Sequence, residues 1–522
     1  MPQEQTVDRP KRWPLIILPE NRGENTSTDA KLVNGFMEKE LRGDFFLYKR
    51  PGLAKQMQLM GGVSPGRGVF NWLGDIYSIF GTTLFRNSDV IGTVDGTNGV
   101  YRFESSMGAV PKLQLGNGKK AYNFDHGGGL VEIEGTGGIV NAGSFKVDFN
   151  YTIATPGTTN FTLIGAVDNL TGTSFVATGV GTGTGNAIEN NFPSNAVKGF
   201  AYLDATTYVM DVQANIRGSA AAQNKPELWP TDNTILVQIE PSRGVFLAKQ
   251  LVYVIAFKES STEVFYDAGN TVGSPLGRVQ GAKVNWGAIS GDSVQDIDGV
   301  LFWLATNRSA AVQVMKLDNL KVDIVSTPAI ERLLSEVDFT AVYSFTVKYH
   351  GHRWYIFTLK NNNLTLAFDL LTGLWAQWTD VNGNYFPIVA STYNTVTAAT
   401  ILQHETNGWL YTVDSETGMD AEDLITVDIY TPNYDGESSR SKTCSVMYFD
   451  ADQVVGSVLQ VRFSDDDYKT WTGFRRVDLG QEKPYLDECG SFDKRRAIHL
   501  RHKSPTRFRI RAIDLQIDIG TL

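Results

Sequence analysis

The sequence predicts an all-β fold: a β-propeller with an inserted β domain and a C-terminal β-sandwich. Residues 341–359 give the plainest evidence, because aromatic and β-branched residues alternate with polar ones on both sides of a His-Gly-His turn. That alternation has the period of half-buried strands in a hairpin. A similar unit, a polar turn with Gly followed by an aromatic strand, recurs at Gly299, Gly351 and Gly408, which are 52 and 57 residues apart. This spacing indicates four-stranded propeller blades.

The other elements are predicted in chain order from local signals. Residues 29–41 are expected to form a helix, and residues 251–266 a second hairpin. A short helix is expected over residues 328–335, because Thr327 can cap it and Pro328 suits its first turn. Residues 454–463 and 506–519 are strand candidates. In residues 506–519 the apolar side chains fall on even-numbered positions up to Ala512 and on odd-numbered positions after it. A β-bulge is therefore expected near Ala512.

Composition limits the class of protein. The chain has 522 residues, enough for two to four domains. Its 42% hydrophobic and 20% charged residues are typical of a globular protein and exclude general disorder. A formal net charge of −10 argues against a basic protein that coats DNA, but it allows an acidic wall along which DNA slides. No signal peptide or bilayer-spanning run is found, so we expect a soluble protein made in a cytoplasm.

Composition shifts divide the chain into four parts. Residues 1–126 hold the N-terminal segment and the first propeller part, and residues 199–438 the remaining blades. Residues 439–522 are expected to form the sandwich. Residues 127–198 are interpreted as an inserted β domain or tip loops, since 127–200 contains 15 Gly and 11 Thr but only seven charged residues. A flexible surface excursion is the alternative. The candidate channel-tip loop consists of Gly179, Val180, Gly181, Thr182, Gly183, Thr184, Gly185 and Asn186.

Several motifs are interpreted as structural. Residues 464–471 resemble an Asp-box, in which the Asp466 carboxylate accepts N–H bonds of a hairpin turn and Trp471 packs below. His350 and His352 could ligate a metal, but a solvated turn is favoured. The glycines after His126 lack the Lys and the helix of a phosphate-binding loop. We therefore expect no catalytic, cofactor-binding or metal-binding residue.

The two cysteines, Cys444 and Cys489, are too few for a disulfide framework and are interpreted as buried free thiols, although they could lie close together.

A cationic block near the C-terminus is a candidate docking or backbone-contact surface. No acid occurs between Asp493 and Asp514. Contact with the DNA backbone is one interpretation. Docking onto an acidic partner subunit is the favoured one, because the whole chain is acidic. The block consists of Lys494, Arg495, Arg496, Arg501, Lys503, Arg507, Arg509 and Arg511.

Residues 272–334 resemble a known family. The shared run includes a "DSV…G…W" pattern from Asp292 to Trp303 and a Ser-Thr pair before a short helix. Residues 367–378 and 44–53 are similar to two further family segments, a "D…TG.W" turn and an "R-PGL" segment. With them, the chain resembles the tail-hub, or packaged-DNA-stabilisation, proteins of short-tailed bacteriophages. The resemblance covers roughly residues 40–120 and 199–522, and the 127–198 region departs from it.

The resemblance implies a non-enzymatic virion protein with a propeller fold. Such proteins form a ring, usually of six copies, below the portal and its adaptor. They close or extend the tail channel, retain packaged DNA and pass it during ejection without reading its sequence. They also anchor fibres or spikes and a needle or plug. No cofactor and no small-molecule substrate are implied.

Two alternatives remain. A sialidase-like propeller that cleaves or binds glycans is suggested by the Asp-box, although no arginine cluster stands out. A host-surface adhesin is suggested by Trp354 and Trp409, whose rings could stack on sugars.

Overall fold

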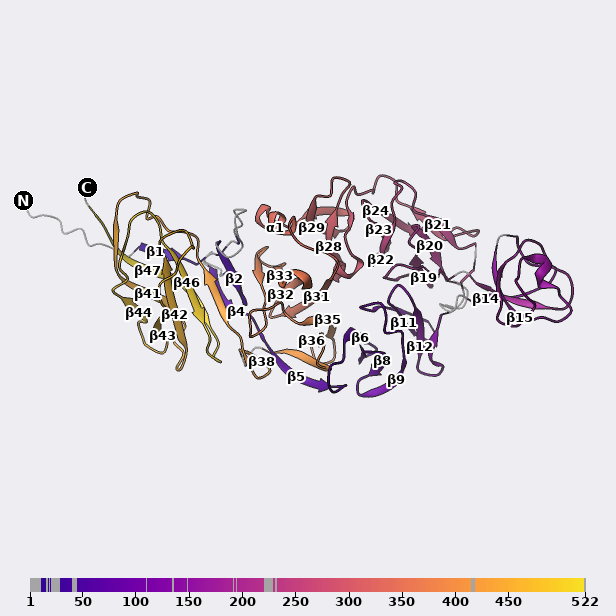
Figure 1. Cartoon of the computed structure of the whole chain (residues 1–522), viewed down its shortest axis with the longest axis horizontal. Helices are drawn as coiled ribbons and strands as arrows, with labels where there is room; N and C mark the ends of the chain where they lie inside the picture. The colour runs from indigo at the N-terminus through magenta and orange to yellow at the C-terminus, as the bar shows by residue number, and fades with distance from the viewer. Residues whose placement is uncertain are drawn as a thin grey trace, which may run out of the picture. The chain divides into compact units, whose positions relative to one another are not determined.

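The all-β class is confirmed. The computed structural model describes residues 11–15, 17, 19, 29–39, 45–108, 110–133, 136–147, 149–190, 192–193, 195–219, 229–230, 232–414 and 418–520. In this part of the chain almost all regular structure is strand, with one α-helix (Figure 1). The chain forms two compact units, unit 1 (residues 1–63 and 325–522) and unit 2 (residues 64–324).

Unit 2 is built mainly from four-stranded antiparallel sheets of the kind that form propeller blades. The first two sheets contain β6 (Gly66–Trp72), β7 (Asp75–Phe80), β8 (Thr83–Arg86), β9 (Asp89–Thr93), β10 (Arg102–Ser106), β11 (Lys112–Gly116), β12 (Ala121–Asp125) and β13 (Gly129–Glu132). The next two contain β18 (Ala201–Leu203), β19 (Thr206–Met210), β20 (Asn215–Gly218), β21 (Thr234–Leu236), β22 (Gly244–Gln250), β23 (Tyr253–Lys258), β24 (Thr262–Asp267) and β25 (Leu276–Arg278). The last contains β26 (Gly287–Ala288), β27 (Gln295–Ile297), β28 (Val300–Thr306), β29 (Val312–Asp318) and β30 (Lys321–Ile324), with a 3₁₀ turn, η3, at Gly291–Ser293.

Consecutive sheets of unit 2 pack face to face, and large apolar side chains fill the space between them. Tyr77 and Leu84 of one sheet share a core with Leu113 of the next. Further along, Phe257 and Trp303 meet in the core between the last two sheets, with ring centroids 5.1 Å apart. Face-to-face packing of this kind lets each sheet bury both of its faces.

The hairpins predicted from the repeated turns are confirmed. At Gly299 the backbone has φ +85°, and its N–H donates to the Asp296 carboxylate at 2.7 Å, which fixes the turn between β27 and β28. At the second turn, Gly351 has φ +86° and joins β31 (Val342–Tyr349) to β32 (His352–Leu359). Glycine accepts this left-handed conformation without a steric penalty, which explains its recurrence in these turns. The hairpin over residues 251–266 is also present, as β23 and β24.

The insert between the second and third sheets of unit 2 folds around a core of its own. Phe145, Tyr151, Phe161 and Phe175 pack together at its centre. A 3₁₀ turn, η2 (Phe161–Ile164), is capped by Asn160, whose side-chain oxygen accepts the Thr162 N–H at 3.2 Å. The sheet has the order β14 (Thr136–Asn141), β17 (Asn186–Asn190), β15 (Asn150–Thr155) and β16 (Ser174–Val176).

Unit 1 holds two further blade-like sheets. The first contains β31, β32, β33 (Leu364–Asp369) and β34 (Trp375–Gln377), with a 3₁₀ turn, η4, at Lys360–Asn362. The second contains β35 (Ile388–Asn394), β36 (Ala399–His404), β37 (Trp409–Asp414) and β5 (Gly52–Gln58), followed by β38 (Met419–Asp420) and β39 (Asp423–Leu424). β5 comes from the N-terminal part of the chain and completes a sheet whose other strands lie more than 300 residues later. The helix α1 (Pro328–Leu334) begins after Thr327, whose hydroxyl accepts the Ile330 N–H, so this prediction is confirmed.

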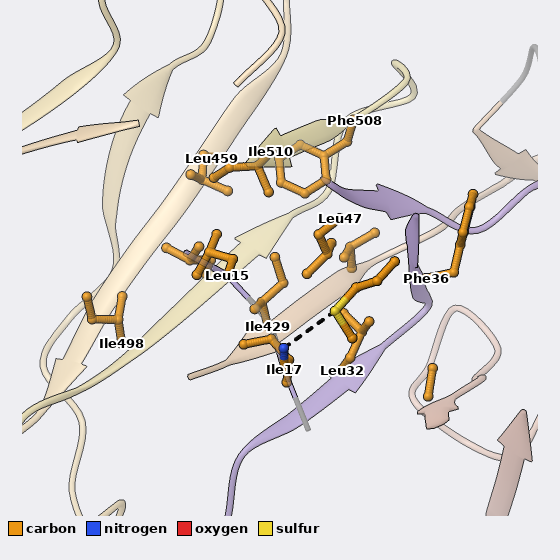
Figure 2. Packing of buried hydrophobic residues seen from close by; sticks show 14 of the residues in the cluster. Leu15, Ile17, Leu32, Phe36, Leu47, Ile429, Leu459, Ile498, Phe508 and Ile510 are labelled. Carbon is orange, nitrogen blue, oxygen red and sulfur yellow. Dashed lines mark hydrogen bonds between the residues drawn. The ribbon is translucent and has the colours of Figure 1, made fainter. Parts of the chain in front are cut away.

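The predicted sandwich is present, but it uses both ends of the chain. One sheet contains β3 (Gly35–Lys39), β4 (Phe45–Lys49), β47 (Arg509–Ile519), β41 (Lys442–Ala451) and β44 (Tyr485–Asp487), with β1 (Lys11–Pro14) on β47 and β45 (Ser491–Phe492) on β41. The facing strands are β2 (Lys31–Val33), β40 (Val427–Tyr430), β46 (Ala497–His502), β42 (Val458–Ser464) and β43 (Arg475–Asp478), and β2 also joins them to β34. Figure 2 shows the core between the two faces, where Leu15, Leu47, Ile429 and Ile510 lie together and the Ile17 N–H points at the Met37 sulfur, 3.4 Å away.

The prediction of a helix over residues 29–41 is wrong for residues 29–39, because β2 and β3 occupy this stretch. Residues 40–41 lie outside the described part of the chain. Asn34 has φ +54° and breaks the segment in two, and its side chain bonds Thr379 and the Thr426 carbonyl. At Gly35 a Cβ atom would lie 2.9 Å from the Tyr48 carbonyl oxygen, so glycine permits the close approach of β4. By contrast, the bulge expected near Ala512 is confirmed, since the pairing of β47 with β41 shifts register there.

Candidate functional sites

The cationic block does not form one continuous charged surface. The guanidinium of Arg496 is buried, donates to both oxygens of Asp465 at 2.7 and 2.8 Å, and reaches the carbonyls of Cys489 and Ser491. Its flat faces stack on two phenylalanine rings. Arg496 is therefore part of the sandwich core.

Four other members of the block lie beside acids. Arg501 donates to Asp428, and Arg509 donates to Asp452 at 2.6 Å. The remaining two pairs are Arg495 with Asp467 at 2.8 Å and Arg511 with Asp450 at 3.8 Å. Exposed positions are taken by Lys494, Lys503 and Arg507. These three cations are the part of the block that is best placed to meet a partner.

Next to the block, the structure shows a surface that the sequence analysis missed. We call it the aromatic–cation face, formed by Lys31, Asp428, Tyr430, Arg462, Trp471, Phe474, His499 and Arg501. The rings of Tyr430 and His499 stack with centroids 3.9 Å apart. The guanidinium of Arg462 lies over Trp471 and Phe474, at 5.0 and 4.5 Å from the ring centroids. Only strand register could have revealed the face, because Lys31, Tyr430, His499 and Arg462 occupy paired positions on four strands that are distant in sequence.

One carboxylate fixes the centre of the aromatic–cation face. Asp428 accepts hydrogen bonds from Nε2 of His499 and Nε of Arg501, at 2.6 and 2.7 Å. Burial alone would raise the pKa of Asp428, but these bonds outweigh it and the pKa is lowered. Burial lowers the pKa of His499, so its ring stays neutral and accepts at Nδ1 the N–H of Arg462. The face has one carboxylate, Asp428, and three cations, Lys31, Arg462 and Arg501. It therefore keeps an excess of positive charge.

The candidate channel-tip loop, residues 179–186, is packed against the rest of the insert. The Gly185 N–H donates to the Thr159 hydroxyl at 2.9 Å, and Thr184 and Thr158 bond each other. At Gly183 and Gly185 a Cβ atom would lie within 2.8 and 2.3 Å of backbone atoms. The glycines here allow tight packing. The apolar side chains exposed on the insert include Val180 in this loop and Leu163, Val167 and Leu170 in η2 and the segment after it.

The Asp-box-like turn is confirmed as a structural feature. Asp466 accepts the Thr470 N–H and hydroxyl at 2.9 and 2.5 Å and the Ser464 hydroxyl at 2.9 Å. These bonds, led by the one from the Thr470 hydroxyl, lower the pKa of Asp466 to about 2. Trp471 packs against Tyr430, with ring centroids 5.8 Å apart.

The other residues singled out in the sequence have structural surroundings. Cys444 and Cys489 are both free and buried, and the Cys444 N–H donates to the Gly490 carbonyl. His350 lies in a turn as predicted, but a solvated position is wrong for His352, which is buried against Phe36 and bonds Asp369 at 2.8 Å. The described residues contain no group of three or more His, Cys, Asp or Glu side chains that could hold a metal. They also include no helix that is both long and apolar enough to cross a bilayer.

The two aromatic residues proposed for sugar contact differ in exposure. Trp354 is buried, so it cannot stack on a sugar, and this part of the adhesin hypothesis is wrong. Trp409 is half-buried and lines a cavity.

A family comparison bears on part of the chain. Residues 241–417 match the family model described as "Bacteriophage P22 Gp10, beta-propeller". The matched segment includes blade-like sheets from both units. Over this segment, the match supports a structural protein of the phage tail and therefore a component of the virion. No curated protein matches the chain.

The solved structures that resemble the chain do so weakly. One is the extracellular domain of a putative one-component system from B. thetaiotaomicron, with 10% identity and a TM-score of 0.40; it covers 87% of this chain. This chain spans 58% of the length of that structure. Another is a computationally designed protein, Ika8, with 12% identity, a TM-score of 0.35, and coverage of 69% of this chain and 99% of the design. TM-scores this low carry no argument about fold or function.

Proposed function

We propose that this chain is the hub, or nozzle, of a short phage tail. In this role a ring of copies, six by family resemblance, extends or closes the DNA channel below the portal and its adaptor. The ring retains packaged DNA, lets it pass during ejection, and anchors fibres or spikes and a needle or plug. The observation that carries the proposal is the match of residues 241–417 to the phage Gp10 propeller family.

The charges of the sandwich favour protein docking over DNA contact. Five of the eight cations in the block lie beside acids of the same unit, which reduces the field they would present to a phosphate backbone. The aromatic–cation face offers rings together with excess positive charge, and such surfaces are typical of protein interfaces. We infer that the sandwich docks on an acidic neighbouring subunit.

The proposal predicts the phenotype of a particle that lacks this chain. Deleting its gene from the phage genome should give heads that package DNA but lose it after lysis, and complementation in trans should restore retention. Nuclease-protected DNA per particle measures the effect, and electron microscopy with a label on the chain should place it at the tail end. Full DNA retention without the chain, or a label away from the tail, would contradict the proposal.

A narrower test addresses the insert. If its loops narrow the channel, deleting residues 180–186 should increase DNA leakage from assembled particles. The matched control shortens an exposed hairpin tip elsewhere, at residues 395–398 between β35 and β36. Unchanged retention in particles that carry the deletion would exclude gating and leave the hub proposal standing.

A further inference from the structure

The cavity of unit 1 that Trp409 lines has a volume of about 510 Å³ and lies apart from the aromatic–cation face and from the insert. Its walls come from β5, from the β36–β37 hairpin, from residues 380–388 and from β38–β39. The volume is in the range of small-ligand sites in proteins. The polar and aromatic lining of the cavity includes Lys55, Asp380, His404, Trp409, Asp420 and Asp423. We propose that this cavity binds a neutral glycan.

One wall of the cavity is the half-buried indole of Trp409. The backbone N–H of Trp409 donates to Oδ1 of Asn407 at 3.0 Å, and the side-chain amide of Asn407 donates to the hydroxyl of Tyr411 at 2.8 Å. The ammonium group of Lys55 lies 5.4 Å from the Trp409 ring centroid and pairs with Glu422 at 2.7 Å. The half-buried indole offers an apolar plane against which the C–H face of a sugar ring can pack.

His404 supplies a donor whose direction is fixed. Its Nδ1 accepts the N–H groups of Thr406 and Asn407 at 3.0 and 3.3 Å, so the ring proton is on Nε2. Burial lowers the pKa of His404 to about 4, and the ring is therefore neutral at physiological pH. In this tautomer the Nε2–H is available to a ligand oxygen.

Carboxylates supply the acceptors. Asp420 is held by the buried guanidinium of Arg50, which reaches both of its oxygens and leaves each with a further lone pair. Asp380 is held in its loop by the N–H groups of Asn382 and Asn384, at 2.9 and 2.7 Å. Preorganised acceptors of this kind limit the entropy lost when a ligand binds.

The mixture of groups selects the class of ligand. Sugar hydroxyls both donate and accept, so they can satisfy the carboxylates and the His404 N–H together. Asp380, Asp420 and Asp423 would repel an anionic ligand such as a nucleic acid or an acidic glycan. A cationic ligand would satisfy carboxylates but would leave the His404 donor unpaired, and the Lys55 ammonium is already paired with Glu422. A neutral, hydroxyl-rich ligand fits all of these groups.

The test uses the full chain on an array of neutral and acidic oligosaccharides, with calorimetry on the strongest hit. Trp409→Ala should weaken binding about tenfold or more, because it removes the stacking plane. Trp471→Ala is the matched control, since it removes a half-buried indole of the aromatic–cation face and should leave affinity unchanged. Asp423→Asn should weaken binding, and Asp478→Asn, an exposed acid of the sandwich, should not.

The outcomes separate this inference from its rivals and from the hub proposal. Absence of binding to every neutral oligosaccharide, or binding that Trp409→Ala leaves unchanged, would overturn it. Preferential binding of acidic glycans or of spermidine would overturn the ligand class. DNA retention by the particle is a separate measurement, so either proposal can fail while the other stands.

Discussion

At the scale of the residue, the sequence shows charges but hides their partners. The cationic block looks continuous in sequence, yet Arg496, Arg501 and Arg509 meet acids that lie 31, 73 and 57 residues away. Pairing at such distances depends on strand register, and the local sequence does not specify that register. Asp466 is different, because all its partners lie within four residues and the turn could be predicted in full.

The buried member of the block gives a stability prediction. Arg496→Ala should destabilise unit 1 by about 3 kcal/mol, since it leaves Asp465 and two carbonyl groups without their donor and opens a cavity between two rings. Chemical denaturation followed by aromatic fluorescence measures the change. Arg507→Ala, at an exposed position, should shift stability by no more than about 0.5 kcal/mol. Equal shifts for the two variants would show that Arg496 is not a core residue.

The Asp466 turn gives a prediction about pH. The folded pKa is about 2 and the ordinary value is 3.8, so the ionised side chain stabilises the fold above about pH 4. This contribution is lost as the pH falls through the folded pKa. Asp466→Asn should therefore lower the unfolding midpoint at pH 6 and have a smaller effect at pH 2. Thermal unfolding at both values measures it, and an equal loss at both would contradict the assignment.

At the scale of the element, local signals predicted what depends on neighbours in sequence. The cap at Thr327, the glycine turns and the bulge near Ala512 are all local, and each prediction is confirmed. Residues 29–39 fail as a helix because their partners, β34, β40 and β4, supply the hydrogen bonds that keep them extended. Two of these strands lie more than 340 residues away in the sequence.

The candidate site depended still more on distant residues. Trp409 was singled out from its turn, but the cavity it lines also needs β5 and β38–β39, whose pairing the sequence did not indicate. Arg50, which holds Asp420 there, is 370 residues from it in the sequence. The sequence therefore allowed only the aromatic residue of this site, Trp409, to be predicted.

The insert gives a prediction about packing. Gly185→Ala would place a Cβ atom 2.3 Å from the Pro156 carbonyl oxygen, so the backbone must shift, at a cost of about 1–3 kcal/mol. Hydrogen exchange of residues 161–177 should accelerate. Gly138→Ala is the control, because no atom lies within 4 Å of its Cβ position. Unchanged exchange in Gly185→Ala would mean that the loop moves freely, as a gate requires.

At the scale of the whole molecule, the acidic net charge conceals where cations are accessible. The formal charge is −10, and much of the basic block is neutralised within unit 1. Lys494, Lys503 and Arg507 remain exposed on an otherwise acidic chain. Like charges repel between copies, so association of acidic copies into a ring favours contacts that place such cations opposite acids.

Contacts between exposed cations and acids make assembly sensitive to salt and to charge reversal. Replacing Lys494, Lys503 and Arg507 by Glu together should weaken ring formation and make it less sensitive to salt between about 50 and 300 mM, because the screened attraction is gone. Sedimentation velocity of the purified chain measures ring content. The control reverses Arg476, Lys469 and Lys483, which are also exposed cations of the sandwich and give the same change in net charge. If both triple variants weaken the ring equally, net charge alone governs association, and the block is not a docking surface.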